Sequence, residues 1–221
     1  FGSREMAARL GADPTLHDEA RPWWAELEAI QRAVLLARVT GARLYICHMT
    51  ITQGAAFLKK AKSDGVDVTA ETCPHYLLFD KTILREKGPY AKCNPPMRSR
   101  DNVDALWEYV FDGTIDTLGS DHGPYADQEK VKHGNFFKEY SGFGGYDAML
   151  AGPLERLAAL TSGNPARVMG LAPRKGALLP GADADIAVVN LDAEWVFDGT
   201  KSLSKTKSSH NIYHGSHLKG K

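Results

Sequence analysis

Three short β-prone runs alternate with helical segments between residues 22 and 120, and this alternation constrains the fold more than any other feature. Helices are predicted over 22–39, 51–65 and 100–113, because apolar residues recur there at helical spacing. Strands that alternate with helices of roughly 10 to 15 residues form a parallel sheet covered by helices, so the predicted fold class is α/β. The β-prone runs are LYICH (44–48), VDVTAE (66–71) and IDTLGS (115–120).

The chain changes character after residue 153. One or two short helices are predicted over 153–171. IAVVNL (186–191) and EWVF (194–197) are β-prone and are interrupted by turn-forming residues, so we predict antiparallel strands of a separate small sheet. The polar tail, 204–221, is expected to be irregular.

The composition excludes several classes of protein. Lys+Arg and Asp+Glu both total 27, so no net charge favours a nucleic acid or an anionic membrane surface. No apolar stretch approaches the roughly 18 to 20 residues of a membrane span, and no signal-peptide layout is present. We therefore expect a cytoplasmic protein whose partner is a small molecule. Three cysteines, Cys47, Cys73 and Cys93, are expected to be reduced, small buried residues at strand ends.

Polar side chains follow each of the three β-prone runs. His48 ends the first run, Glu71 to His75 follow the second, and Asp121 with His122 follow the third. Ligands bind at the carboxyl ends of parallel strands, so these residues are the first candidates for chemistry. Taken singly, each could be an ordinary hydrogen-bonded residue at a strand end. Taken together, two imidazoles and a carboxylate suit zinc or a similar divalent ion, and both interpretations stay open on spacing alone.

Several segments resemble the cyclic amidohydrolases, a family that includes hydantoinases and dihydropyrimidinases, allantoinases and dihydroorotases. The later segments of the chain resemble the tail of the same family. The segments that carry the resemblance are YICHMT (45–50), ETCPHYL (71–77), KCNPPMR (92–98), GSDHGPY (119–125), NPARVMGL (164–171), KGALLPGADADIAVV (175–189) and HNIYHGSHLKGK (210–221).

The resemblance implies a (β/α)8 TIM-type barrel with a small β-sandwich domain. Residues 1–172 would form the C-terminal part of the barrel, and residues 173–221 would form the C-terminal part of the sandwich and the tail. The family's HxH pair after the first barrel strand, and its carboxylated lysine after the fourth, have no counterpart in this sequence. We therefore expect the activity to belong to the complete polypeptide, a homo-oligomer such as a dimer or tetramer, and expect these residues alone to be inactive.

The resemblance also implies the roles of individual residues. His48, His75 and Asp121 match metal ligands of a zinc site that is binuclear in the family, with Glu71 and Thr72 supporting His75. Asp121 would in addition take a proton from the attacking water and deliver it to the leaving nitrogen.

Two further residues match positions near the substrate. Asn94 is either a substrate contact or a turn residue before two prolines, and His122 either lines the pocket or hydrogen-bonds a ligand. Arg98 is expected to pair with a carboxylate or to cap the following helix. The other histidines are expected to be solvated: His17, His133, His210, His214 and His217.

The predicted function is metal-dependent hydrolysis of a cyclic amide, by ring opening of a hydantoin or dihydropyrimidine type of ureide. Allantoinase and dihydroorotase are the alternatives, and Tyr125 argues mildly against dihydroorotase, which typically carries another histidine in this loop. An alternative of another class is a catalytically inactive scaffold protein that keeps the same fold.

Overall fold

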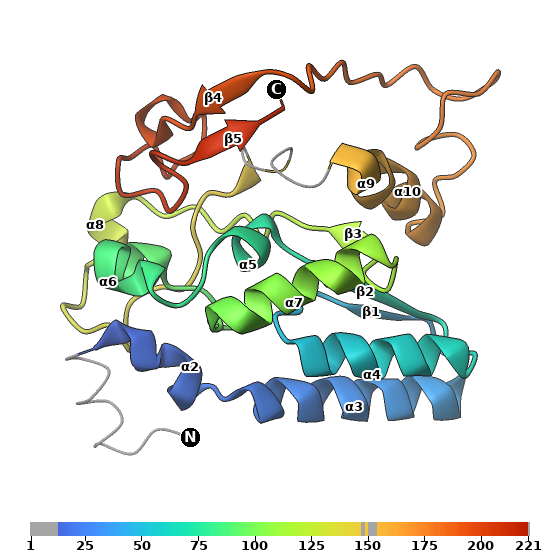
Figure 1. The fold of residues 1–221 in the computed structure, drawn as a ribbon, viewed down its shortest axis with the longest axis horizontal. Coiled ribbons are helices and arrows are strands. Elements are labelled where there is room, and N and C mark those ends of the chain that lie inside the picture. The colour runs from blue at the N-terminus through green and yellow to red at the C-terminus, as the bar shows by residue number, and fades with distance from the viewer. Residues whose placement is uncertain (1–12, 147–148, 150–153, 221) are drawn as a thin grey trace.

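The computed structural model describes residues 13–146, 149 and 154–220 (Figure 1). Short helical turns labelled η are of 3-10 type, except η4, which is π-helical. The elements in chain order are η1 Pro14–Leu16, α2 His17–Ala20, α3 Trp23–Thr40, β1 Leu44–Ile46, α4 Thr52–Ser63, β2 Val68–Thr72, α5 Pro74–Leu78, α6 Ile83–Lys87, η2 Gly88–Ala91, α7 Arg100–Phe111, β3 Thr117–Leu118, α8 Asp127–Lys130, α9 Leu154–Ala158, η4 Ala159–Gly163, α10 Asn164–Val168, β4 Glu194–Val196, η5 Gly199–Lys201 and β5 His217–Lys219.

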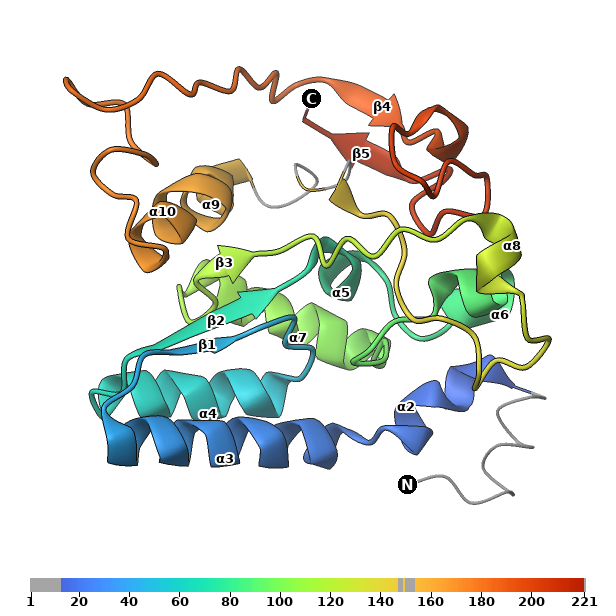
Figure 2. The same ribbon diagram turned by 180° about the vertical axis from the view of Figure 1, so that it is seen from behind.

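The predicted α/β alternation is confirmed. β1, β2 and β3 form a parallel sheet in that order, with Leu44 opposite Val68 and Glu71 opposite Thr117. The helices α3, α4 and α7 lie together on one side of this sheet in both views (Figures 1 and 2). Within the described residues the three strands form an open sheet and not a closed barrel.

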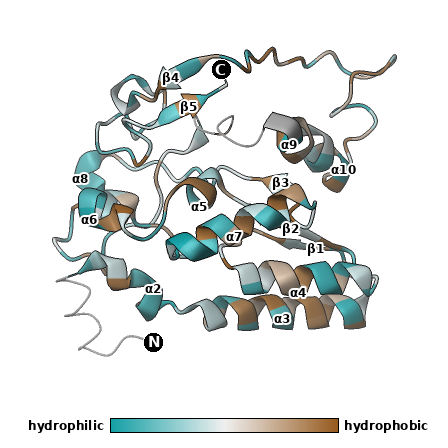
Figure 3. Ribbon diagram, viewed as in Figure 1, coloured by the Kyte–Doolittle hydropathy of each residue, from teal (hydrophilic) through white to brown (hydrophobic). Residues whose placement is uncertain are grey.

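The helices form where the sequence predicts them because each buries one apolar face. Helix α3 follows Pro22 and ends at Gly41, whose φ of 70° lies in the left-handed region that glycine tolerates. Its buried residues, Ile30 among them, are spaced at helical intervals between exposed ones, and Figure 3 shows the resulting alternation of colour along the helix. Helix α4 packs closely on it, since a Cβ at Gly54 would lie 2.8 Å from Cδ1 of Ile30.

The C-terminal part departs from the prediction in two places. Residues 186–191 form no strand, and Ile186 and Val188 are 62% and 91% exposed. The tail is not irregular throughout, because His217–Lys219 forms β5 and pairs antiparallel with β4. β4 itself was predicted, and its partner strand comes from the polar tail instead of from 186–191.

Burial bears on two smaller predictions. Cys73 and Cys93 are buried as predicted, whereas Cys47 is exposed. His17 was expected to be solvated but is 4% exposed, with its ring edge-on to Phe136 at 5.3 Å. Within the described residues, no helix combines the length and the apolar character needed to cross a membrane.

Candidate active site at the strand tips

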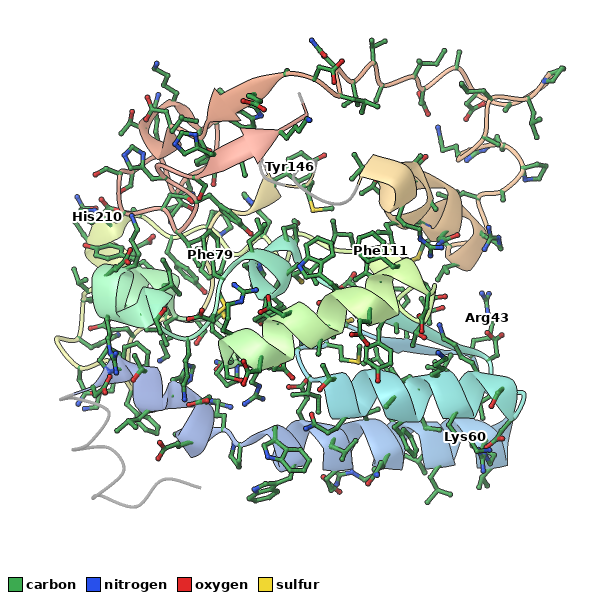
Figure 4. The ribbon with its side chains drawn as sticks, viewed as in Figure 1. Arg43, Lys60, Phe79, Phe111, Tyr146 and His210 are labelled. Atoms are coloured by element: carbon green, nitrogen blue, oxygen red, sulfur yellow. The ribbon has the colours of Figure 1, made fainter. Side chains whose placement is uncertain are left out.

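The parallel sheet brings the polar strand ends to one edge. Cys47 and His48 follow β1, α5 with His75 begins two residues after β2, and Asp121 lies three residues after β3. Figure 4 shows Arg43 and Lys60 at the other end of the sheet, away from Phe79. His48, His75, Asp121 and His122 therefore belong to the carboxyl-terminal edge of the strands, whereas Asn94 follows η2 and no described strand.

His48 and Asp121 share an unusual backbone conformation. Their φ angles are 40° and 44°, and in the described part of the chain they are the non-glycine residues with positive φ. A residue held in this region costs about 1–3 kcal/mol, and such strain persists where the surroundings impose it, often at functional sites. Both residues were predicted as metal ligands from the sequence.

His75 lies in a closed aromatic environment. Its ring is fully buried, 4.1 Å from the Tyr76 ring and 4.9 Å edge-on from the Phe143 ring. Nδ1 lies 3.4 Å from the hydroxyl of Tyr213, which comes from the C-terminal tail. Burial, assisted by the nearby His48, lowers the pKa of His75 to about 3, so the imidazole is neutral at physiological pH. A neutral imidazole is the form that binds a metal.

Unpartnered polar atoms gather at the same strand tips. Among the described residues, eight buried side-chain atoms have no hydrogen-bond partner, and three of them are Nδ1 of His48, Nε2 of His75 and Oδ1 of Asn94. A buried polar atom without a partner costs about 1–3 kcal/mol and calls for an explanation such as a ligand or an ion. The two imidazole nitrogens are the right donors for a divalent metal.

The carboxylate of Asp121 belongs to the same electrostatic neighbourhood. Desolvation raises its pKa, the nearby His48 opposes that rise, and Glu71 adds to it. In the part of the chain that the structure describes, however, no three or more His, Cys, Asp or Glu side chains form a group that could hold a metal ion. The fit to a metal therefore rests on the two unpartnered imidazole nitrogens, and this chain's described residues do not complete a ligand set.

Asn94 and His122 both hydrogen-bond to residues in the segment 141–146. Asn94 donates from Nδ2 to Oγ of Ser141 at 2.7 Å, which leaves its buried Oδ1 free. His122 accepts at Nδ1 from the backbone N–H of Gly145 and Tyr146, both at 3.4 Å, so it is held by the loop carrying Tyr146, labelled in Figure 4.

A cleft of about 700 Å³ runs along β1 and the first half of α3. His48 and Asn94 both line it, together with Cys47 and the two prolines after Asn94. Its walls are mostly apolar with a few polar groups, which is typical of small-molecule sites. His75, Asp121 and His122 are not among the residues that line this cleft.

Two contacts of the site differ from the prediction or were missed by it, and one was predicted. Glu71 was assigned to support His75, but its carboxylate accepts a hydrogen bond from the backbone N–H of His48 at 3.0 Å. Tyr213, which contacts His75, was not singled out, although it lies in the HNIYHG segment. The predicted pairing of Arg98 with a carboxylate is confirmed, since its guanidinium lies 2.9 Å from Glu26.

The parallel sheet and its polar strand tips define an α/β chain whose site lies at the carboxyl ends of its strands. Residues 27–216 match the model of the Amidohydrolase family. The chain belongs to the amidohydrolase family, in the cyclic amidohydrolase branch with allantoinases and hydantoinases. The resemblance noted in the sequence is thereby confirmed.

Allantoinases of Salmonella newport (strain SL254) and Salmonella heidelberg (strain SL476) are each 36% identical to the chain over 205 residues. The match covers 87% of this chain and 44% of each allantoinase, so the chain spans less than half the length of these curated relatives.

Two solved structures are also similar. L-hydantoinase (dihydropyrimidinase) from Arthrobacter aurescens is 34% identical with a TM-score of 0.82, over 90% of this chain and 46% of that one. D-hydantoinase from a Bacillus sp. AR9 is 27% identical with a TM-score of 0.86, over 99% of this chain and 51% of that one. The structure thus matches about half of a hydantoinase chain.

Proposed function

We propose that the complete protein opens a cyclic ureide of the hydantoin or dihydropyrimidine type by hydrolysis of a ring amide. The observation that carries this proposal is the strained backbone at His48 and Asp121, combined with unpartnered imidazole nitrogens on His48 and His75. Strain and unsatisfied polar atoms at adjacent strand tips support a site that binds something other than protein atoms.

His48 and His75 would hold a divalent ion such as zinc, with Asp121 as a further ligand and the remaining ligands supplied from outside the described residues. When bound, such an ion would polarise the amide carbonyl and lower the pKa of a water molecule. Asp121 would act as the proton carrier, taking a proton from the attacking water and passing it to the leaving ring nitrogen.

The finer fold is part of the proposal. We propose that residues 1–172 contribute the C-terminal part of a (β/α)8 barrel and that residues 173–221 contribute to a small β-sandwich. The match to about half of each hydantoinase chain supports this, as does the open sheet. The activity then belongs to a complete polypeptide that closes the barrel.

The substrate would bind at the mouth of the cleft that His48 and Asn94 line. The free Oδ1 of Asn94 can accept a hydrogen bond from a ring N–H, and the apolar walls suit the flat face of a ring. Allantoin is the second candidate substrate, because the allantoinases are 36% identical to the chain. Allantoin is itself a hydantoin with a ureido substituent, so it presents the same five-membered ring as the hydantoin type of substrate.

The test is metal analysis of the complete protein together with hydrolysis of hydantoin, dihydrouracil, allantoin and dihydroorotate. We expect bound metal and turnover of at least one five- or six-membered ureide. Absence of both would favour the inactive scaffold. Preference for dihydroorotate, whose six-membered ureide ring carries a carboxylate, would favour the dihydroorotase alternative.

Asp121→Asn removes the proton carrier and changes a proposed metal ligand, so the metal content of the variant is measured together with its turnover. Asparagine tolerates the left-handed backbone at this position as well as aspartate does. We expect turnover to fall by about 10²-fold or more with little change in thermal stability. Near-normal turnover in this variant would refute the role of Asp121.

A further inference from the structure

We propose that Glu71 is a positioning residue that aims His48, and that Gly119 makes room for it. This inference rests on the proposed function, because it assigns the residue that sets the direction of one proposed metal ligand. The carboxylate of Glu71 would act from β2, the neighbour of the strand that precedes His48, without touching the substrate.

The carboxylate of Glu71 links all three strands of the sheet. Oε1 accepts from the backbone N–H of His48 at 3.0 Å, and Oε2 accepts from the hydroxyl of Tyr45 at 2.8 Å. The Tyr45 hydroxyl in turn lies 2.8 Å from Oγ1 of Thr117 on β3. One side chain on β2 therefore engages β1 on one side and, through Tyr45, β3 on the other.

The end of β2 also holds the residue after His48. The backbone N–H of Met49 donates to the carbonyl of Glu71 at 2.8 Å, and the hydroxyl of Thr72 donates to the carbonyl of Met49 at 2.8 Å. The turn at 48 and 49 is thus fixed by three hydrogen bonds from two adjacent residues of β2. The bond to Oε1 is the one that reaches His48 itself, whose ring Nδ1 has no partner among the described residues.

This arrangement explains how His48 keeps an unfavourable backbone conformation. A histidine at φ 40° relaxes unless its surroundings hold it. A hydrogen bond to an ionised carboxylate is roughly twice as strong as one between neutral groups, so Oε1 is suited to hold the N–H of His48. The direction of the imidazole then follows from a backbone that β2 fixes.

Gly119 gives a second, independent observation. A Cβ at position 119 would lie 2.4 Å from both Cδ and Oε2 of Glu71. The carboxylate therefore lies against the bare backbone just after β3, in space that any other residue would fill. Because Gly119 has no side chain, the carboxylate of Glu71 has a defined place at the end of β3, and this supports a specific placement of its two oxygens.

The experiment uses the complete protein and measures its affinity for Zn²⁺ or Co²⁺ by competition with a chelator, alongside kcat and KM. Glu71→Ala removes both arms of the carboxylate, and we expect metal affinity to fall about 10- to 100-fold, as for other residues that orient metal ligands. The loss should appear in kcat more than in KM. Glu71→Gln should restore most of the affinity, because its amide oxygen can accept from His48 while its NH₂ donates to Tyr45.

Tyr45→Phe is the matched control. It removes the bond to Oε2 and leaves the bond to His48, so we expect metal affinity within about threefold of the wild type. If Glu71→Ala does not fold, Gly119→Ala replaces it as the test, because the added Cβ displaces the carboxylate while Glu71 is retained. That variant should show the same loss of metal affinity.

The outcomes separate this inference from the proposed function. A wild-type protein that binds no metal, or a His48→Ala variant that binds it as tightly as the wild type, would overturn the proposed function. Tight binding that depends on His48 but not on Glu71 would overturn only the positioning role. An equal loss in Tyr45→Phe and Glu71→Ala would also overturn it, because general bracing of the strands would then be sufficient.

Discussion

The ion pair of Arg98 and Glu26 offers the sharpest test of how the cleft is held together. Their side chains are 7% and 11% exposed, and Nη2 of Arg98 lies 2.9 Å from Oε2 of Glu26. The other guanidinium nitrogens donate to Oγ1 of Thr50 at 3.0 Å and to the carbonyl of Arg21 at 2.8 Å. Thr50 also donates to Glu26 from its backbone N–H and its hydroxyl.

This network joins three segments that are distant in sequence. Glu26 belongs to the first turns of α3, Thr50 follows the strand tip of β1, and Arg98 ends the KCNPPMR segment that carries Asn94. Each segment contributes residues to the 700 Å³ cleft. Loss of Arg98 would therefore loosen the cleft as well as the fold.

We expect Arg98→Met to lower the free energy of unfolding by about 3 kcal/mol, toward the lower end of the range for breaking a buried ion pair. The lower end applies because Glu26 keeps two hydrogen bonds from Thr50. At a urea slope of about 3 kcal/mol per molar, which suits a chain of this size, the unfolding midpoint moves by about 1 M. Equilibrium urea unfolding followed by tryptophan fluorescence measures the shift.

Arg100→Met is the control, since Arg100 is 44% exposed and its pair with Asp104 is an i,i+4 surface pair. We expect a change of no more than about 0.5 kcal/mol there. The double variant Arg98→Met with Glu26→Met should be less destabilised than the sum of its two single variants, because no unpaired buried charge remains. A loss below about 1 kcal/mol in Arg98→Met, or strict additivity in the double variant, would refute the buried network as a stabilising unit.

Three further outcomes are expected. Burial lowers the pKa of Lys130 to about 8, so the buried cation destabilises the fold at neutral pH. This destabilisation decreases as the pH rises toward the pKa of the lysine in the unfolded chain. Between about pH 7.5 and about pH 9.5 the unfolding free energy should therefore rise by about 1–2 kcal/mol more in the wild type than in Lys130→Met, and equal changes would contradict this burial. Gly199→Ala places a Cβ 2.3 Å from the carbonyl of Ser208 and should cost about 1–3 kcal/mol, whereas at Gly163 the nearest atom would be 3.5 Å away and the thermal midpoint should hardly change. Ser208→Ala removes the hydroxyl bond to Asp127 at 2.7 Å, so limited proteolysis should cut the C-terminal tail faster than in the wild type, and an unchanged rate would contradict this tether.

The α/β core could be predicted because its signals are local. Each helix buries a face whose spacing is visible in the sequence, and β2 is buried over most of its length. The segment 186–191 has the same β propensity but no partner strand among the described residues. Strand formation needs a partner that supplies the ladder of hydrogen bonds, and propensity does not name one. β5 was not predicted because it has a partner but almost no pattern: it is three residues long and Leu218 alone is buried.

The sequence could predict only those residues of the candidate site that lie close to the end of a strand in the chain. His48 ends a β-prone run, Asp121 follows another directly and His75 comes four residues after a third, which makes them visible in the sequence. The contact of Tyr213 with His75 joins positions 138 residues apart, and no local pattern indicates it. The buried His17 was missed in the same way, because its neighbour Phe136 comes from a loop far along the chain.

Glu71 shows why a correct residue can be given the wrong partner. Its position shortly before His75 in the sequence suggested support for that ligand. Successive residues of a strand point to opposite faces, however, and His75 lies in the first turn of α5 and not in β2. The carboxylate instead reaches across to β1, where the Tyr45 hydroxyl and the backbone N–H of His48 both donate to it. Sheet order, which the sequence does not state, decides which neighbour a strand residue meets.

Two strained residues and two unpartnered nitrogens support function at the strand tips independently of family membership. Elsewhere in the described chain, positive φ angles belong to glycines, which adopt them without strain. At His48 and Asp121 the chain keeps a conformation that glycine would adopt without strain, and two buried imidazole nitrogens, on His48 and His75, have no partner among the described residues. Stability alone would favour residues that remove both strained backbone conformations and both unpartnered nitrogens. Their coincidence at one edge of the sheet is what a site retained for chemistry requires.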